Sequence, residues 1–200
     1  MAEGPIYEIS KFRIMKNQES HQVVPHKAQL QFNNKTVFKL MREEFPTIPI
    51  HCFNLLDYNE LPARNKKDTI LTDIIGLIKE MHQVQDTPVR GQLAKTRELR
   101  IQNTRNEELQ ATLWGELALD FDAEKILQLP PPAVIVITSS KVATYAKKIV
   151  VNTSLDSCVF INPNIPELQE YQTRYTFKDK NMAIIDIRSS LFANTKFRTP

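Results

Sequence analysis

The order of short apolar segments between residues 69 and 161 constrains the fold more than any other feature of the sequence. Residues 69–81 (TILTDIIGLIKEM) are rich in β-branched side chains, and Gly76 among them favours a barrel strand that bends at the glycine. Residues 98–102 and 109–114 alternate apolar with polar side chains on either side of a turn. Because a period of two is typical of half-buried strands, these two segments predict a β-hairpin.

A helix is expected over residues 116–127, after the hairpin. Leu117, Phe121 and Leu127 recur there near helical spacing, and the prolines at 130–132 end the segment. An apolar run at residues 134–137, which residues 141–145 continue, predicts a fourth strand, and residues 149–151 predict a fifth. A further short apolar run follows at residues 159–161. Five short strands with a helix between the third and the fourth is the order of the OB-fold. The sequence therefore predicts an all-β chain built around a five-stranded OB-fold barrel.

Residues before the barrel are patterned more weakly. Residues 6–14 and 28–38 predict two or three short strands, with a turn at Asn33-Asn34. Residues 41–49 contain two prolines and predict a linker.

Composition excludes several classes of protein. Apolar residues make up 42% of the 200 residues and charged residues 24%, a balance typical of a globular chain. No window approaches 18 uncharged apolar residues, so no membrane helix is expected, and the N-terminus lacks the pattern of a secretory signal. Cys52 and Cys158 are too few for a disulfide framework and fit a reducing compartment.

The net charge of +3 is small, but the basic residues are clustered. The polar segment 83–91, which contains Pro88, predicts a mobile loop between the first two barrel strands. Between residues 88 and 106 a single acid, Glu98, accompanies five basic side chains: Arg90, Lys95, Arg97, Arg100 and Arg105. A second basic cluster without an acid consists of Lys141, Lys147 and Lys148. Each cluster fits a solvated surface or a surface for nucleic acid.

The strand 109–114 can be interpreted by its pleat. Leu109, Ala111 and Leu113 share one side, so Trp114 lies on the other side with Gln110 and Thr112. In the partner strand, Leu99 and Ile101 are expected to point inward, and Arg100 and Gln102 outward. If the leucines fill the barrel, Trp114 stands on the outer face, where an aromatic ring beside cations suits single-stranded nucleic acid. The pattern equally allows a half-buried Trp114 packed under the following helix.

Four stretches of the sequence resemble one family. KDTILTDIIGLIKE, AKTRELRIQNTRNEELQATLWGE, KVATY and FINPNIPE are similar to the second of the tandem DNA-binding OB-folds in the replication protein A large subunit. The segment RELRIQNTRNE resembles the plant branch of that family. The resemblance runs from about residue 50 to about residue 171, and its most specific part is TLWGE followed later by NPxIPE.

This resemblance implies largely sequence-independent binding of single-stranded DNA in replication, repair or recombination, and a location in the nucleus. Trp114 matches the base-stacking tryptophan of that domain, Tyr145 its second stacking aromatic, and Arg97 a basic residue beside the groove. Arg90 and Lys95, on the mobile loop between the first two strands, are expected to close over the bound DNA. Arg97, Arg100, Lys141, Lys147 and Lys148 are expected to contact its phosphates. The chain departs from the family at Ala146-Lys147, where a Gly-Gly turn is frequent, and one extra residue is expected near this turn.

The resemblance also implies a domain organisation. Residues 1–45 are expected to be the last strands of a preceding OB-fold with a linker, and residues 46–171 the DNA-binding OB-fold. Residues 172–200 form a C-terminal extension, with a candidate helix near 182–191. Residues 4–40 are too few for five strands of about five residues plus a helix, so we interpret the chain as a shortened relative. Expected partners are single-stranded DNA and the other polypeptides of the replication protein A complex.

No set of residues predicts catalysis, a metal or a cofactor, so a binding protein rather than an enzyme is expected. His51 and Cys52 are adjacent and point to opposite sides of an extended segment. Asp120 and Asp122 lack further ligands, and the four glycines form no phosphate-binding loop. The alternative hypotheses are a protein-interaction OB-fold with weak or lost nucleic-acid binding, and an RNA-binding domain.

Overall fold

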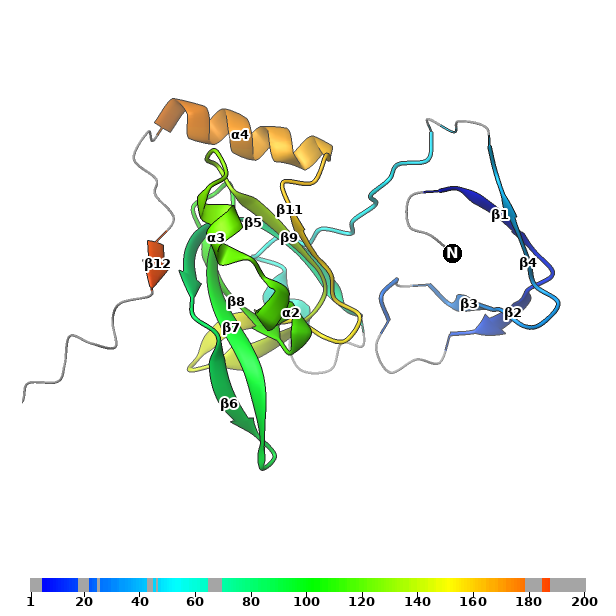
Figure 1. The fold of residues 1–200 in the computed structure, drawn as a ribbon, viewed down its shortest axis with the longest axis horizontal. Coiled ribbons are helices and arrows are strands. Elements are labelled where there is room, and N and C mark those ends of the chain that lie inside the picture. The colour runs from blue at the N-terminus through cyan, green and yellow to red at the C-terminus, as the bar shows by residue number, and fades with distance from the viewer. Residues whose placement is uncertain are drawn as a thin grey trace, which may run out of the picture.

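The computed structural model describes residues 5–17, 22–24, 26–42, 45, 47–64, 70–178 and 185–187 (Figure 1). Its strands are β1 (Tyr7–Ser10), β2 (Arg13–Lys16), β3 (Ala28–Gln31), β4 (Val37–Leu40), β5 (Thr72–His82), β6 (Gln85–Val89), β7 (Gln92–Gln102), β8 (Glu108–Trp114), β9 (Val134–Tyr145), β10 (Lys148–Asn152), β11 (Val159–Ile161) and β12 (Ile185–Ile187). Its helices are α1 (Leu61–Arg64), α2 (Glu116–Asp120), α3 (Ala123–Leu127) and α4 (Pro166–Lys178).

Five strands close into a barrel. β5 pairs antiparallel with β7 on one side and with β9 on the other, and β7 pairs antiparallel with β8. β9 continues into an antiparallel hairpin with β10, and β10 pairs in parallel with β8, which completes the ring. The strand order β5–β7–β8–β10–β9, with helices between β8 and β9, is that of the OB-fold. The predicted fold class is therefore confirmed.

The connection between β8 and β9 differs in detail from the single predicted helix. It consists of the two short helices α2 and α3, because the backbone is extended at Phe121 (φ −68°, ψ 100°). Asp122 then begins α3, where its side chain accepts a hydrogen bond from the backbone N–H of Lys125 at 2.9 Å. The sequence pattern predicted the periodic apolar residues but not the extended residue between the two helices.

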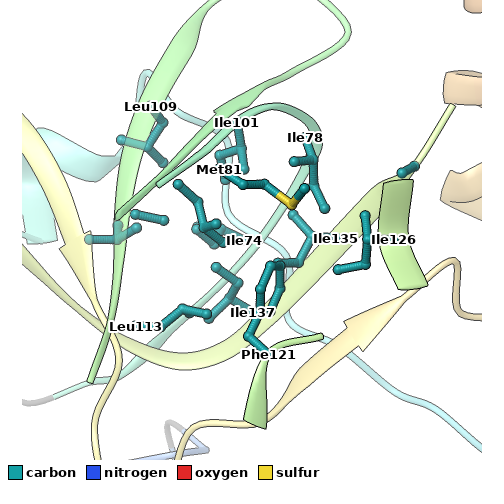
Figure 2. Close-up of a cluster of buried hydrophobic side chains, with 14 of the residues drawn as sticks. Ile74, Ile78, Met81, Ile101, Leu109, Leu113, Phe121, Ile126, Ile135 and Ile137 are labelled. Atoms are coloured by element: carbon teal, nitrogen blue, oxygen red, sulfur yellow. The ribbon is translucent and has the colours of Figure 1, made fainter. Parts of the chain in front are cut away.

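Alternate side chains fill the barrel, as the pleat predicts. Leu109, Ala111 and Leu113 of β8 are buried, and so are Leu99 and Ile101 of β7. Figure 2 shows this cluster, which is completed by side chains of β5, β9 and the α2–α3 segment: Ile74, Ile78, Met81, Ile135, Ile137, Phe121 and Ile126. The polar residues between these positions therefore point away from the core.

Gly76 lies in β5, as predicted, but the structure gives it a second role. A Cβ atom at this position would lie 2.5 Å from the hydroxyl oxygen of Tyr58. That hydroxyl donates a hydrogen bond to the carbonyl of Ile75 at 3.0 Å, and the hydroxyl of Tyr171 in α4 donates to the same carbonyl at 3.2 Å. The absence of a side chain at Gly76 thus makes room for a tyrosine bonded to the strand.

The prediction of a loop at residues 83–91 is wrong. β6 pairs with β7 from Gln85↔Thr96 to Val89↔Gln92, and the connecting turn uses positive φ at Arg90 (49°) and Gly91 (81°). Among the described residues β6 pairs with β7 alone, so it is an edge strand there, where a proline is tolerated because no further neighbour needs its missing N–H. The β6–β7 ribbon projects from the barrel (Figure 1).

The C-terminal part also differs from expectation. α4, which was not predicted, begins at Pro166 and runs through the expected boundary between residues 171 and 172. Its Tyr171 packs with Leu77 and Val134, which covers the back of β5 and β9. Most of the candidate helix near residues 182–191 lies outside the described residues. Residues 185–187 of that range form β12, a strand parallel to β5, so the helix prediction is wrong there.

The N-terminal segment forms four strands, where two or three were predicted. β1 pairs with β4 and β2 with β3, each pair antiparallel, and the predicted Asn33-Asn34 turn is closed by a hydrogen bond from Thr36 N to Asn33 O. These strands expose large apolar side chains: Ile14, Met15, Leu30, Val37, Phe38 and Leu40. Four short strands in two separate pairs do not make a closed barrel. The assignment of this segment to the end of a preceding OB-fold stays a prediction.

Candidate nucleic-acid interface

One sheet surface, here named the outer face, runs across β7, β8, β10 and β9. Residues paired across neighbouring strands share a face, so the registers define its rows of side chains. The first row contains Thr96 and Trp114, and the second contains Glu98, Thr112, Asn152 and Lys141. The third contains Arg100, Gln110, Val150 and Ala143. At the far end Gln102 pairs with Glu108, and Lys148 pairs with Tyr145. Trp114 and Tyr145 therefore lie at opposite ends of one face. Their rows are about six residues apart along β8, a span of roughly 20 Å.

Trp114 is half-buried, and the barrel core is made of other side chains. Its indole N–H donates to the side-chain oxygen of Asn152 at 3.0 Å, and its backbone N–H donates to the hydroxyl of Thr153 at 2.9 Å. The pleat prediction is confirmed, because Trp114 lies on the face opposite Leu113. The Asn152 contact sets the orientation of the ring, so the tryptophan is held in place before any ligand arrives.

Tyr145 ends β9 and is 70% exposed. It pairs directly with Lys148 across a two-residue turn, in which Ala146 and Lys147 have φ of 48° and 66°. Positive φ at both central residues is the requirement of the type I′ hairpin, which is why glycines are frequent there. The turn has no extra residue, so the departure from the Gly-Gly pattern changes the turn's strain and leaves the pairing intact.

Three of the predicted basic residues lie on the β9–β10 hairpin. Lys141 and Lys148 are on the outer face, and Lys147 is in the turn. Arg90 is at the tip of the β6–β7 ribbon. All four side chains are exposed, and no carboxylate of the described residues has an ion pair with any of them. Their charges are therefore available to a ligand.

Two other predicted cations are paired with acids. The ammonium group of Lys95 lies 2.8 Å from Asp86. The guanidinium of Arg100 lies 3.2 Å from Glu80 and 3.4 Å from Glu108. Lys95 lies in β7, so the expectation that it is on a mobile loop is wrong. Because the side chains of Lys95 and Arg100 are about half exposed, each ion pair contributes little to the free energy of folding. A phosphate can therefore replace the acid as the partner of either cation.

Arg97 occupies a different place from the one that the resemblance implies. It pairs with Leu113, so its side chain starts on the inward face of β7. Its guanidinium donates to the carbonyls of Ala118 (3.2 Å) and His82 (3.3 Å) and lies 5.5 Å from the centre of the Phe121 ring. The structure does not bring Arg97 to the outer face; it ties α2 to the barrel strands.

Arg105 belongs to the basic cluster of the sequence but serves the fold. Its guanidinium binds the carboxylate of Asp57 and lies 2.7 Å from that of Glu107, so the β7–β8 turn is fastened to the segment before α1. Hydrogen bonds from Arg105 hold the pKa of Asp57 below its usual value. They lower the pKa of Glu107 too, with a smaller contribution from the Asn103 amide. Asp57 is too distant in the sequence for any local pattern to reveal this contact.

Gln102 is buried, although the pleat predicted an outward position. It lies on the outer face at the end of β7, where its amide donates to the carbonyl of Asn106 at 3.4 Å and the turn covers it. Asn152 also lies on the outer face, but the sequence did not predict it as a site residue. Nothing in the sequence of β10 marks it as the partner of Trp114.

A groove of about 460 Å³ opens at the end of the outer face that carries Lys148. We name it the Tyr58 groove, and its lining includes Tyr58, Asn59, Arg100, Glu107, Glu108, Gln110 and Lys148. A second groove of about 400 Å³ lies between the α2–α3 segment and β11 and is mostly apolar, with Leu117, Phe121 and Val159 among its lining residues.

In the described part of the chain, no group of three or more His, Cys, Asp or Glu residues is arranged to hold a metal ion. No helix within the described ranges could span a membrane.

The comparisons with known proteins agree with this geometry. Residues 59–162 match the family described as Replication protein A OB domain. The Replication protein A 70 kDa DNA-binding subunit of Xenopus tropicalis is 26% identical over 81% of this chain and 25% of its own length. One of the 70 kDa DNA-binding subunits of replication protein A from Arabidopsis thaliana is 23% identical over 92% of this chain and 29% of its own length. The chain thus spans about a quarter of these relatives. Frog and Arabidopsis sequences match at similar identity, so the plant-type assignment stays a prediction.

A solved structure supports the fold. A chain in the structure of a replication protein A heterotrimer bound to single-stranded DNA superposes with a TM-score of 0.63 at 20% identity, covering 93% of this chain and 42% of that chain. The family match extends over more than half of the sequence and coincides with the closed barrel and its outer face. The chain therefore belongs to the replication protein A OB-domain family.

Proposed function

We propose that this chain binds single-stranded DNA in DNA replication, with little dependence on base sequence. The observation that carries the proposal is the outer face, which has Trp114 at one end, Tyr145 at the other and Lys141 and Lys148 between or beside them. Aromatic rings stack on any base and cations track the phosphates, which is the chemistry of single-strand binding on OB-folds. The names of the relatives, DNA-binding subunits of replication protein A, agree with it.

Each predicted residue receives a role from its position. Trp114 and Tyr145 stack bases. Lys147 and Lys148 bind phosphates near Tyr145, and Lys141 binds a phosphate between the two aromatic residues. Arg90 and Lys95 lie on the β6–β7 ribbon, which can close over a bound strand near Trp114. Arg100 exchanges its acidic partners for a phosphate or a base. Arg97 acts as a positioning residue, since its guanidinium is bound to the barrel and α2.

The proposal extends to the organisation of the chain and to its partners. Residues 1–45 act as a partial OB-fold with a linker, residues 46–171 bind DNA, and residues 172–200 form an extension that starts within α4. Other replication protein A subunits are the proposed protein partners, and the nucleus is the proposed location. Roles in repair and recombination follow from the same single-strand chemistry.

A second function is favoured by two observations. Lys95, Arg100 and Arg105 are all paired with acids, and the groove between the α2–α3 segment and β11 is mostly apolar. Both features suit an OB-fold that binds a protein rather than a nucleic acid. RNA is the third candidate ligand, because stacking platforms accept either polymer.

The deciding experiment is titration of the purified chain with an unstructured oligodeoxynucleotide at roughly 50 and 200 mM salt. Four available cations, Arg90, Lys141, Lys147 and Lys148, give a slope of log affinity against log salt of about −3, or roughly a 50-fold loss over this range. Duplex DNA of equal length should bind more weakly, and an RNA of the same sequence reports the RNA alternative. Equal binding of duplex and single strand, or no salt dependence, would favour the protein-interaction function.

A further inference from the structure

The Tyr58 groove adjoins the outer face and shares residues with it. Arg100, Gln110 and Lys148 belong to outer-face rows and also line the groove. Tyr145 is directly opposite Lys148, so a strand that stacks on Tyr145 passes the rim of the groove. The groove is therefore within reach of the nucleotide next to the one on Tyr145.

The charges in the groove suit a base better than a phosphate. Two cations, Arg100 and Lys148, are balanced by two carboxylates, Glu107 and Glu108. A phosphate placed there would be repelled by both acids, whereas a base is neutral and has a polar edge. The ring of Tyr58 supplies an aromatic wall, and its hydroxyl is already bonded to the carbonyl of Ile75.

The polar groups in the groove are complementary to one base in particular. The contacts of Arg100 with Glu80 and Glu108 use its Nε and Nη1 atoms, which leaves the N–H groups of Nη2 for a ligand. Through Nη2 the arginine can donate to O6 or N7, the guanine acceptors that arginine favours. The carboxylate of Glu108, 3.4 Å from Arg100, can accept from the N1–H and N2–H groups on the other side of O6. Guanine alone among the DNA bases combines these acceptors with these donors.

We propose that the Tyr58 groove is a guanine-binding subsite, in which Arg100 and Glu108 bind the base edge and Tyr58 contacts its ring. The proposal rests on the single-strand binding proposed above. It gives the chain a base preference at one position, while Trp114 and Tyr145 stack any base elsewhere.

The test compares a thymidine oligomer with oligomers of the same length that carry one guanine at each position in turn. In fluorescence anisotropy titrations, guanine at the favoured position should raise the affinity about tenfold, the range of one well-made base contact. Inosine, which lacks the N2 amino group, and 7-deazaguanine, which lacks N7, should each recover only part of the gain.

Two matched variants locate the preference. Glu108→Gln removes the charge in the groove and replaces one of the two acceptor oxygens by a donating NH2 group, which cannot accept from guanine. Glu98→Gln makes the same change at an exposed outer-face position outside the groove. Both should bind the thymidine oligomer more tightly, because each removes a charge that repels phosphates. Only Glu108→Gln should lose the guanine preference.

The outcomes separate the two proposals. Salt-dependent binding of thymidine oligomers without a gain from guanine overturns the subsite and leaves the single-strand function standing. A preference that Glu98→Gln also abolishes, or a gain from cytosine instead of guanine, overturns the subsite as well. Failure to bind any oligomer overturns both proposals.

Discussion

Replacing Trp114 by alanine tests the outer face most directly, because it is the chain's only tryptophan. Truncating a fully buried tryptophan costs roughly 3–5 kcal/mol of stability, and Trp114 is only half-buried. The change also removes the hydrogen bond to Asn152, which contributes about 0.5–1.5 kcal/mol. The expected loss in the free energy of unfolding is therefore about 2–3 kcal/mol, small enough for the barrel to stay folded.

The loss in binding should exceed what the loss in stability can explain. Stacking of one base on an aromatic ring contributes about 1–3 kcal/mol, so Trp114→Ala should weaken binding by roughly 5-fold to 150-fold. Trp114→Phe keeps an aromatic surface and should lose much less. Leu113→Ala is the matched control: the leucine is adjacent in β8 and fully buried in the barrel, so this change lowers stability by about 2–5 kcal/mol and leaves binding of the folded protein nearly unchanged.

The assays are denaturant unfolding followed by circular dichroism, anisotropy with a labelled oligomer, and tryptophan emission of the unmodified chain. A base that stacks on Trp114 should quench its emission, and no other tryptophan contributes to the signal. If DNA leaves the emission unchanged and folded Trp114→Ala binds as tightly as the parent chain, the outer face is not the binding surface.

Four further changes test the fold around this surface. Ala146→Gly should raise stability by up to about 1 kcal/mol in thermal unfolding, because φ is +48° there, and no gain would contradict the strained turn. Gly76→Ala should destabilise the barrel, since its Cβ would lie 2.5 Å from the Tyr58 hydroxyl, and Tyr58→Phe should relieve part of that loss. Asp57 and Glu107 have lowered pKa values in the fold, so their pairing with Arg105 stabilises the chain above the usual carboxylate pKa of about 4. That contribution is lost as the pH falls through the folded pKa values, and Arg105→Ala should flatten the acid limb of the stability curve. Deleting residues 1–45 should leave a folded barrel that still binds, because the hydrogen bond from Leu71 N to Gln22 O is replaceable by water; unfolding would show that the segment is integral.

The barrel could be predicted because its information is local. Alternation in residues 98–102 and 109–114, and the apolar runs around them, specify which side chains face inward, and the structure buries Leu99, Ile101 and Leu113 accordingly. β6 was missed because a proline in a polar segment is typical of a loop, and only the pairing with β7 reveals an edge strand. α4 was missed because its apolar contact is concentrated at Tyr171, which packs against β5 and β9, distant in the sequence.

The position of a site residue could be predicted where it depends on one strand alone. Contacts between residues of two strands could not be predicted. The pleat of β8 placed Trp114 on the outer face, but the partner Asn152 comes from β10. The clustering of basic residues in the sequence was a poor predictor of which cations are available to bind DNA.

Of the five basic residues between 88 and 106, Lys95, Arg100 and Arg105 are paired with acids. Arg97 is bound to backbone carbonyls of α2 and β5. Arg90, at the tip of the β6–β7 ribbon, is exposed. The smaller cluster at 141–148 keeps its three lysines unpaired within the described chain, because both β9 and β10 lack acidic residues. Substituting Lys148 should therefore weaken DNA binding and its salt dependence more than substituting Arg105, whose loss should mainly lower stability.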